Sequence, residues 1–410
     1  MLHIKKNEFY QILLILIIIF SNCTGLLQII GGSVFAEGSI ILLTFFLMIM
    51  LVIDKTTIGK FDIIMLFIAI YSIFITVIRI INNEIELTSL ICFYSYLLPS
   101  LIFINRKHNF FKNNANIFFK VFTIMILINA LYAIFQRFCI NAIIPLEFGR
   151  ARGLMKTTLN FSGIIGVMFF PIISYFTTVK NKLIVSFTVA MILIGSIFSL
   201  SRGLFANLLL GFAIAPFFQT FILKKYNKQI IIKYIGTVMI AILAFMFILI
   251  ILNQLGILEQ FDRLLHIFDY QNDKANTIRT AKWSNFFDYF IAKPFGYGVG
   301  QIDSGTIFVS KPVNFESYIL DTVYSIGLLS IPYFLIPVIY IYKNISICSL
   351  ATIQYASMFV IGIFVQNLVQ PSMLTPTTLI CTWLTICFFA NYLQQIDYKI
   401  KSKRNFHAKT

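Results

Sequence analysis

The sequence predicts an all-α polytopic integral membrane protein, and both its composition and the spacing of its apolar residues support this. Of the 410 residues, 59% are hydrophobic and only 12% are charged, whereas a soluble domain is about half apolar and about a quarter charged. The apolar residues form runs that are long enough to cross a bilayer as helices. We therefore expect a single membrane domain over residues 1–410, with about twelve transmembrane helices of about 20 residues each.

The expected spans are apolar runs separated by short polar segments. They lie near residues 9–31, 33–53, 61–81, 87–104, 116–139, 159–178, 183–200, 203–223, 231–252, 317–342, 346–366 and 372–393. One long loop remains at 253–316, between the ninth and tenth spans. The first apolar run is too long for a cleaved signal peptide, so we expect it to remain as the first helix.

Charge sets the expected orientation. If the amino terminus is cytoplasmic, the whole formal net charge of +16 falls on segments that face inward, as the positive-inside rule requires. The sequence then predicts a plasma (inner) membrane protein with both termini in the cytoplasm and the loop at 253–316 facing outward. Because topology accounts for the positive charge, we expect no nucleic-acid partner.

The cysteines and histidines give no sign of a structural or metal-binding framework. The six cysteines lie in or beside apolar runs without paired loop spacing, and the four histidines are scattered. We therefore expect no disulfide framework, no metal site and no cofactor.

Lysine and arginine are distributed differently between the two sides. Most lysines fall on inward segments, whereas Arg106 and Arg404 are the only inward arginines. Topology does not distinguish the two residue types, but a guanidinium binds a phosphate or carboxylate through two parallel hydrogen bonds. The outward arginines therefore favour an anion site, although a lysine-rich composition could also leave a few arginines there by chance. These outward residues are Arg79, Arg137, Arg150, Arg152, Arg202, Arg263 and Arg279.

Two short outward segments could carry such a site. The loop at 147–153 holds Arg150 and Arg152 between glycines, which would let a phosphate approach the backbone closely. The turn at 201–203 places Arg202 near the hydrocarbon boundary, where desolvation favours an anionic partner. The alternatives are that the loop only solvates an exit from the bilayer and that Arg202 extends to lipid phosphates.

The long loop contains a predicted amphipathic helix near residues 276–291. Its apolar residues recur at helical spacing, with Arg279 one turn before the first of them on the same stripe. They are Trp283, Phe286, Phe287, Phe290 and Ile291. Such a helix lies on the membrane or packs on the bundle. We expect the aromatic residues to serve packing rather than to form a platform for sugar rings.

The end of the loop combines closely spaced glycines with a carboxylate. The run FGYGVG at 295–300 is not a dinucleotide-binding fingerprint, and its three alternating glycines instead predict a tight bend or a close backbone approach. Glu316 follows where the chain re-enters the membrane, and partial desolvation there suits a general base. The alternative is an acid that complements a helix dipole. Asp321, one turn deeper, is a second candidate base.

Taken in order, these segments resemble the O-antigen polymerase and ligase superfamily over roughly residues 130–335. The matching positions are Gln136, Arg150, Arg152, Gly153, Ser201, Arg202, Gly203, Arg279, Trp283, Pro294, 296–300, Glu316, Ser317, Tyr318 and Gly327. The resemblance implies a GT-C-like membrane fold. It also implies transfer of a glycan from an undecaprenyl-diphosphate carrier at the outer face of the membrane.

The same resemblance implies roles for individual residues and partners. Catalysis would fall to Glu316, Arg279 and Arg202. Binding of the diphosphate or of the rest of the substrate would fall to Arg150, Arg152, Arg202, Arg279, Trp283 and Tyr318. The ligase branch usually has a histidine where this chain has Glu316, which favours an O-antigen or capsule polymerase of the Wzy type. The implied partners are an undecaprenyl-diphosphate-linked oligosaccharide, membrane lipid and a chain-length co-polymerase.

Two other functions stay open at the level of sequence. A ligase would transfer a finished glycan to lipid A-core or to a protein. A flippase or permease for the same lipid-linked glycan would be a transporter rather than an enzyme. Almost no ionisable residues occur in the middles of the expected spans, and no half of the chain repeats, so transport is the least favoured function.

Overall fold

The computed structural model of the chain describes residues 6–54, 57–84, 92–139, 141–217, 274–299, 315–343 and 350–407. Over those ranges the regular structure is helical, and β-type pairing is limited to an isolated bridge between Glu147 and Arg150. The prediction of an all-α protein is confirmed.

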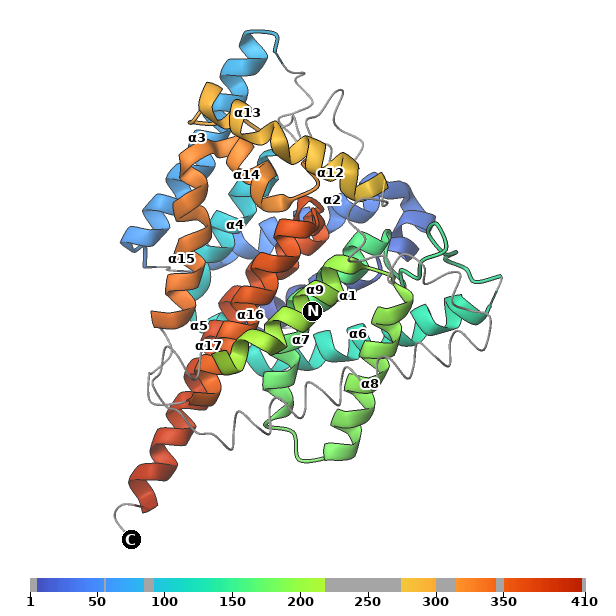
Figure 1. Ribbon diagram of the computed structural model, residues 1–410. Helices are drawn as coiled ribbons and strands as arrows, with labels where there is room; N and C mark the ends of the chain where they lie inside the picture. The colour runs from blue at the N-terminus through green and yellow to red at the C-terminus, as the bar shows by residue number, and fades with distance from the viewer. Residues whose placement is uncertain are drawn as a thin grey trace, which may run out of the picture.

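The helices are named here in chain order, as labelled in Figure 1. Before residue 218 they are α1 (Lys6–Asn22), α2 (Thr24–Ile53), α3 (Lys60–Ile81), α4 (Tyr94–Ile104), η2 (Asn105–Lys107), α5 (Asn109–Asn113), α6 (Ala115–Phe138), α7 (Thr158–Phe176), α8 (Lys182–Phe198) and α9 (Arg202–Phe217). After residue 273 they are α12 (Lys274–Ser284), α13 (Phe286–Ala292), α14 (Tyr318–Ile326), η5 (Gly327–Leu329), α15 (Ser330–Lys343), α16 (Leu350–Val369), η6 (Ser372–Leu374) and α17 (Pro376–His407).

Seven described helical stretches are long and apolar enough to cross a membrane. They are Thr24–Ile53, Lys60–Ile81, Ala115–Phe138, Thr158–Phe176, Tyr318–Lys343, Thr352–Val369 and Pro376–Ile396. Two shorter apolar helices, Lys182–Phe198 and Arg202–Ala213, match the expected seventh and eighth spans. The polytopic membrane class is thus confirmed, while the expected ninth span at 231–252 lies outside the described residues.

The amino-terminal region has one helical break where hydropathy predicts it and a second one that hydropathy does not predict. The expected boundary near residue 32 is a kink inside α2, where Gly32 has a non-helical backbone (φ 80°), and α1 ends earlier, at Asn22. The loop after α6 packs at the observed break, where the amide of Gly25 donates to the carbonyl of Leu154 at 2.8 Å. The boundary predicted near residue 32 thus coincides with the kink at Gly32. The additional break after Asn22 was not predicted, because hydropathy does not record such a long-range contact.

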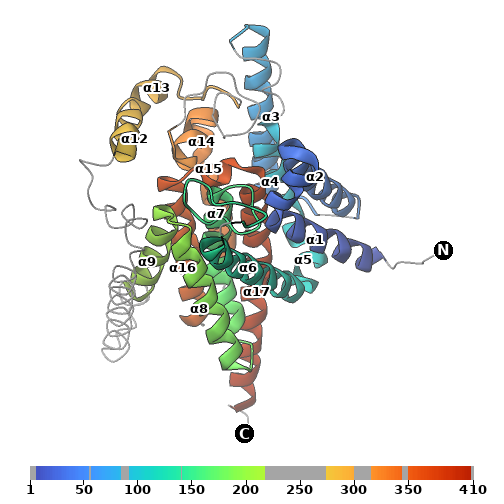
Figure 2. The same cartoon turned by 90° about the vertical axis from the view of Figure 1, so that its right-hand side faces the viewer.

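Helix α17 runs through the interior of the bundle, and many other helices pack against it (Figures 1 and 2). Phe388 of α17 stacks on Phe118 of α6 with ring centroids 4.2 Å apart. Trp383, also on α17, packs edge-on to Phe103 of α4. A helix that is apolar on all sides is expected to be buried in this way.

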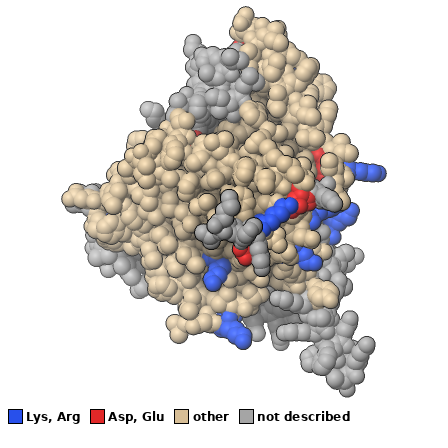
Figure 3. All heavy atoms as spheres, turned by 180° about the vertical axis from the view of Figure 1, so that it is seen from behind, with Lys and Arg blue, Asp and Glu red and all other residues tan. Residues whose placement is uncertain are grey.

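The outside of the bundle carries large apolar side chains over wide areas. Figure 3 shows one face with a broad expanse free of charged side chains, and most of the Lys, Arg, Asp and Glu residues that it shows lie between the lower centre and the right of the view. Exposed residues of α3 include Phe67, Ile70 and Phe74, which are 55%, 58% and 60% exposed. An apolar surface of this extent suits contact with lipid.

The turn between α7 and α8, which the sequence assigns to the inner side, and the helices α12 and α13, which it assigns to the outer side, lie at different ends of the bundle. The turn between α7 and α8 lies at the lower end of Figure 1, towards the carboxyl-terminal end of α17. The helices α12 and α13, and the start of α9, lie in the upper half of the same view. This is the separation expected for inward and outward segments.

The expected tenth span is a broken helix. Helix α14 ends before Gly327, which has a positive φ of 58°, and the chain resumes as α15 after one 3-10 turn. The segment at 294–298 fills the break. The amides of Tyr297 and Gly298 donate to carbonyl groups at the end of α14, at 2.8 and 2.9 Å.

Two glycines make this close contact possible. A Cβ atom on Gly296 (φ 93°) would overlap the carbonyl oxygen of Ser325, and one on Gly327 would overlap the carbonyl oxygen of Pro294. The close backbone approach predicted from the glycine run is therefore present. Gly300, the last glycine of the run, lies outside the described residues.

We predict that Gly296→Ala destabilises the protein, because the added Cβ would overlap Ser325. The left-handed backbone alone costs an L-residue about 1–2 kcal/mol. Gly38→Ala on α2 is the matched control, since nothing lies within 4 Å of its Cβ position. Thermal unfolding in detergent should give a lower Tm for Gly296→Ala only. Equal Tm values for both variants would contradict the close packing of 294–298 on α14.

Candidate functional site

A carboxylate held by two cations lies where α12 meets the start of α14. Glu316 accepts a hydrogen bond from Arg279 (Nη2 to Oε2, 3.1 Å) and one from Lys282 (Nζ to Oε1, 3.1 Å). The side chain of Glu316 is 28% exposed, and those of Arg279 and Lys282 are 25% and 36% exposed. A polar or anionic substrate can therefore reach all three.

The backbone around Glu316 is held in an uncommon conformation. Glu316 has a positive φ of 53°, which few residues other than glycine adopt. The amide of Phe315 donates to Oδ1 of buried Asp321 (3.0 Å), and the carbonyl of Phe315 accepts from Nε1 of Trp283 (2.7 Å). The side chain of Ser317 caps α14. Asp321, expected as an alternative base, thus positions the turn that carries Glu316.

An aromatic cluster holds α12 and α13 against α14. The expected amphipathic helix at 276–291 is divided at Asn285 into these two helices. Phe286, Phe315 and Tyr324 form the buried centre of the cluster, with Trp283 packed against it. Trp283 is therefore a packing residue, as expected for the aromatic stripe, and its binding of substrate stays a prediction.

Lys282 is the site residue that the sequence analysis missed. It lies three residues after Arg279, which puts both cations on one face of α12. That spacing is visible in the sequence, but the carboxylate partner is 34 residues away, and only folding brings it near. Two cations and one carboxylate leave the cluster with a positive charge, which favours binding of an anion.

The loop at 139–157 is organised by one buried glutamine of α6. Oε1 of Gln136 accepts from the amides of Arg152 (3.1 Å) and Gly153 (3.0 Å). Its Nε2 donates to the carbonyls of Ile144 (2.7 Å) and Gly153 (3.1 Å). All hydrogen-bonding atoms of this side chain therefore act on the loop. The resemblance pointed to Gln136, but only the structure shows this role.

The side chain of Arg152 braces the same loop. Its guanidinium donates to the carbonyl of Pro145 (3.0 Å) and to the carbonyl of Lys156. The ammonium of Lys156 in turn pairs with Glu37 of α2 at 2.8 Å. The contacts of Arg152 are those of a structural residue, and its binding of phosphate stays a prediction.

The structure places Arg150 and Arg202 on adjacent segments. The amide of Ala151 donates to the carbonyl of Phe198 at the end of α8 (2.9 Å), and Arg202 begins α9 shortly afterwards. Both arginines are half-buried. Two of the predicted anion-binding residues, which are far apart in the sequence, therefore lie on neighbouring segments of the structure.

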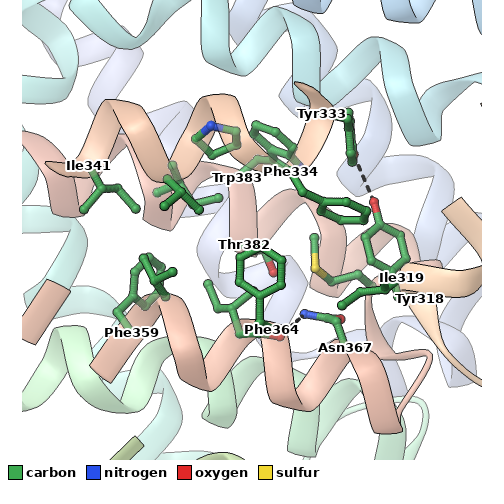
Figure 4. A pocket seen from close by; sticks show the side chains of 16 residues that line it. Tyr318, Ile319, Tyr333, Phe334, Ile341, Phe359, Phe364, Asn367, Thr382 and Trp383 are labelled. Carbon is green, nitrogen blue, oxygen red and sulfur yellow. Dashed lines mark hydrogen bonds between the residues drawn. The ribbon is translucent and has the colours of Figure 1, made fainter. Parts of the chain in front are cut away.

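Tyr318 points into an apolar cavity between α14, α15, α16 and α17 (Figure 4). The hydroxyl of Tyr318 forms a hydrogen bond with that of Tyr333 (2.9 Å), and the ring is almost fully buried. The structure thus places this predicted substrate-binding residue among apolar side chains such as Phe334 and Trp383 rather than among the cations.

Arg79, another of the outward arginines, is engaged in structural contacts. Its guanidinium donates to the carbonyl of Tyr297 and pairs with Glu84 (Nε to Oε2, 2.8 Å). The hydrogen bond from Arg79 holds the pKa of Glu84 below its usual value. This outward arginine therefore serves packing of the broken helix, so outward position alone does not identify an anion-binding residue.

The fold and the site together define the class of protein. It is a polytopic helical membrane protein with a carboxylate bound by two cations where α12 meets the start of α14. In the part of the chain that the structure describes, no three His, Cys, Asp or Glu side chains gather as a metal site would require. The residues present can bind an anion and accept a proton.

Residues 186–326 match the family model Wzy_C, described as O-Antigen ligase. This match places the chain in the O-antigen polymerase/ligase superfamily and confirms the resemblance seen in its sequence. The matched region contains Arg202, Arg279, Lys282 and Glu316. No curated protein matches the chain.

We predict that Gln136→Met loosens the loop at 139–157, because two amides and two carbonyls lose their partner. Each buried polar group left without a hydrogen bond costs about 1–3 kcal/mol. The Tm in detergent should fall, and the loop should be cleaved faster by protease. Gln394→Met on α17 is the control, since Gln394 is exposed. An unchanged Tm and cleavage rate in Gln136→Met would show that the loop does not depend on this side chain.

Proposed function

We propose that the protein is a polysaccharide polymerase that joins repeat units carried on undecaprenyl diphosphate. The product would be an O-antigen, a capsule or an exopolysaccharide. Membership of the O-antigen polymerase/ligase superfamily supports a membrane enzyme of this general type. As the resemblance implies, the protein would have a GT-C-like membrane fold.

The observation that carries the proposal is the placement of Glu316 between Arg279 and Lys282. A glycosyl transfer from a lipid diphosphate needs a group that accepts a proton and groups that stabilise the leaving diphosphate. This cluster supplies a carboxylate for the first task and two cations for the second. Arg150 and Arg202 would add further contacts to the diphosphate or to an acceptor phosphate.

The proposed step is an exchange at the anomeric carbon of the donor glycan. The hydroxyl oxygen of the acceptor sugar forms a bond to that carbon, and the bond from the carbon to the diphosphate oxygen breaks. Glu316 takes the hydroxyl proton and later releases it to water. Arg279 and Lys282 turn from Glu316 to the departing lipid diphosphate, whose negative charge they stabilise.

The same proposal extends to location and partners. The protein would lie in the plasma membrane with both termini in the cytoplasm and the segment at 253–316 on the outer side. Residues 1–410 would form one integral membrane domain. A chain-length co-polymerase would accompany it, and surrounding lipid would supply the donor and acceptor carriers.

A ligase that transfers finished glycan to lipid A-core or to a protein is the second candidate. The description of the matching family model, O-Antigen ligase, is the observation that favours it. The carboxylate of Glu316, at a position where the resemblance leads us to expect histidine in ligases, favours the polymerase.

We predict that Glu316→Gln lowers the rate of glycan elongation by about 10²–10⁴-fold, because an amide cannot accept the proton. Arg279→Ala should lower it by about 10²–10³-fold, because a donor to the developing charge is lost. Elongation is measured with purified protein and lipid-linked repeat units, and in the native host by the length of the surface glycan ladder.

The control for this pair of variants is Lys180→Ala, in the exposed turn between α7 and α8. It should elongate at the wild-type rate. Wild-type ladders from well-expressed Glu316→Gln and Arg279→Ala proteins would refute the roles assigned to both residues.

Deletion of the gene should separate polymerase from ligase. Loss of a polymerase leaves acceptors that carry a single repeat unit, whereas loss of a ligase leaves long chains on the lipid carrier. Gel analysis of the surface glycan together with extraction of the lipid-linked fraction distinguishes these results. Accumulation of long carrier-linked chains would exclude the polymerase.

A further inference from the structure

The segment that follows α13 runs alongside a candidate membrane span. The hydroxyl of Tyr71, midway along α3, donates to the carbonyl of Phe295 (2.8 Å). Further along, the hydroxyl of Thr76 accepts from the amide of Val299 (2.9 Å), and Gly298 lies against the backbone of Thr76. The chain from 295 to 299 therefore packs on the upper half of α3 rather than above it.

The position on α3 gives the depth of the segment. Five residues separate Thr76 from the last residue of α3, Ile81, which corresponds to about 7–8 Å along a helix. Tyr71 lies about 15 Å below the same end. Phe74 and Ile81 are 60% and 72% exposed. Because these apolar side chains need lipid around them, the hydrocarbon reaches a level above the segment.

The backbone of the segment is suited to such a depth. Irregular backbone is tolerated in the bilayer only where its polar groups find partners within the protein. The amides of Tyr297, Gly298 and Val299 are all bonded within the protein, two to carbonyls freed at the break of α14 and one to Thr76. The carbonyls at the end of α14 thus accept hydrogen bonds from a segment that cannot form hydrogen bonds with water at this depth.

The outer face of the segment is apolar and exposed. Phe287, Ile291 and Phe295 are 67%, 75% and 63% exposed. Their neighbours on the bundle side, by contrast, are packed in the aromatic cluster around Phe286. The exposed face continues the lipid-facing surface of α3, since Phe295 and Tyr71 are in contact.

Two cations next to this face, Lys293 and Arg79, point back towards the end of α3, while Asp288 is exposed in the first turn of α13. The ammonium of Lys293 lies 3.5 Å from Glu84, just beyond that end, and 5.0 Å from the ring of Tyr297. Arg79 is 8% exposed and pairs with the same carboxylate. Both cations thus reach a polar partner near the end of α3 while the apolar side chains remain outside, as expected at a bilayer boundary.

We propose that residues 286–299 form a re-entrant segment immersed in the half of the bilayer next to the site, with Phe287, Ile291 and Phe295 in contact with lipid acyl chains. The segment that hydropathy assigns to an aqueous loop is then partly a lipid-binding surface. It fixes the height of α12, and with it the cations Arg279 and Lys282, at the membrane boundary. This inference does not depend on the reaction proposed above.

The test uses tryptophan fluorescence, because the chain has only two tryptophans. In a full-length Trp283→Phe, Trp383→Phe background, single tryptophans are introduced as Phe287→Trp, Ile291→Trp or Phe295→Trp. Ile70→Trp, on the exposed face of α3, is the control for lipid contact, and Ser284→Trp, exposed on α12, is the control for water. Each protein is reconstituted in nanodiscs of ordinary or acyl-brominated phosphatidylcholine and titrated with iodide.

Tryptophans at 287, 291 and 295 should lose emission in brominated lipid to an extent similar to Ile70→Trp, and iodide should quench them little. Ser284→Trp should show the reverse. Emission at 287 and 295 that is quenched by iodide, or by neither agent, would overturn the proposal, since the face would then meet water or another protein. If one variant fails to reconstitute as a monodisperse protein, the other two positions decide the result.

Discussion

The requirement that backbone amides and carbonyls find partners away from water is the constraint on which this structure depends. Helix α14 breaks at Gly327, and the carbonyls freed at the break accept the amides of Tyr297 and Gly298. Only glycines at 296 and 327 allow the two chains to come this close. The break in turn fixes where α13 and α12 lie, and therefore where the cations of the candidate site meet their carboxylate.

In the loop at 139–157, side chains rather than a broken helix provide the hydrogen-bond partners of the backbone. Gln136 supplies both acceptors and donors to the loop at 139–157, and Asn129 of α6 accepts the amide of Leu154. Buried amide side chains can serve amides and carbonyls at once, which suits an irregular chain. Two irregular segments are thus hydrogen-bonded to the helical bundle, and the one at 139–157 carries the predicted site residues Arg150 and Arg152.

The candidate site is positively charged yet internally paired. Glu316 pairs with both Arg279 and Lys282. In the proposed reaction, a phosphate oxygen would replace this carboxylate beside the two cations. A substrate diphosphate would exchange one anionic partner for another, so binding need not leave a cation unpaired. The aromatic cluster beneath, centred on Phe286 and Phe315, holds the helix that carries both cations.

The sequence by itself determined the membrane class, most of the spans and the position of the glycine contact. The length of an apolar run depends on the thickness of the bilayer, and a glycine is required where the backbone bends tightly. Both are local properties that can be read from the sequence without knowing which distant residues are in contact. Tertiary structure decided the rest: that α1 ends at Asn22, that Lys282 shares Glu316 with Arg279, and that Arg79 serves packing. These features arise from contacts between residues far apart in the chain, and composition or spacing carries no record of which distant groups meet.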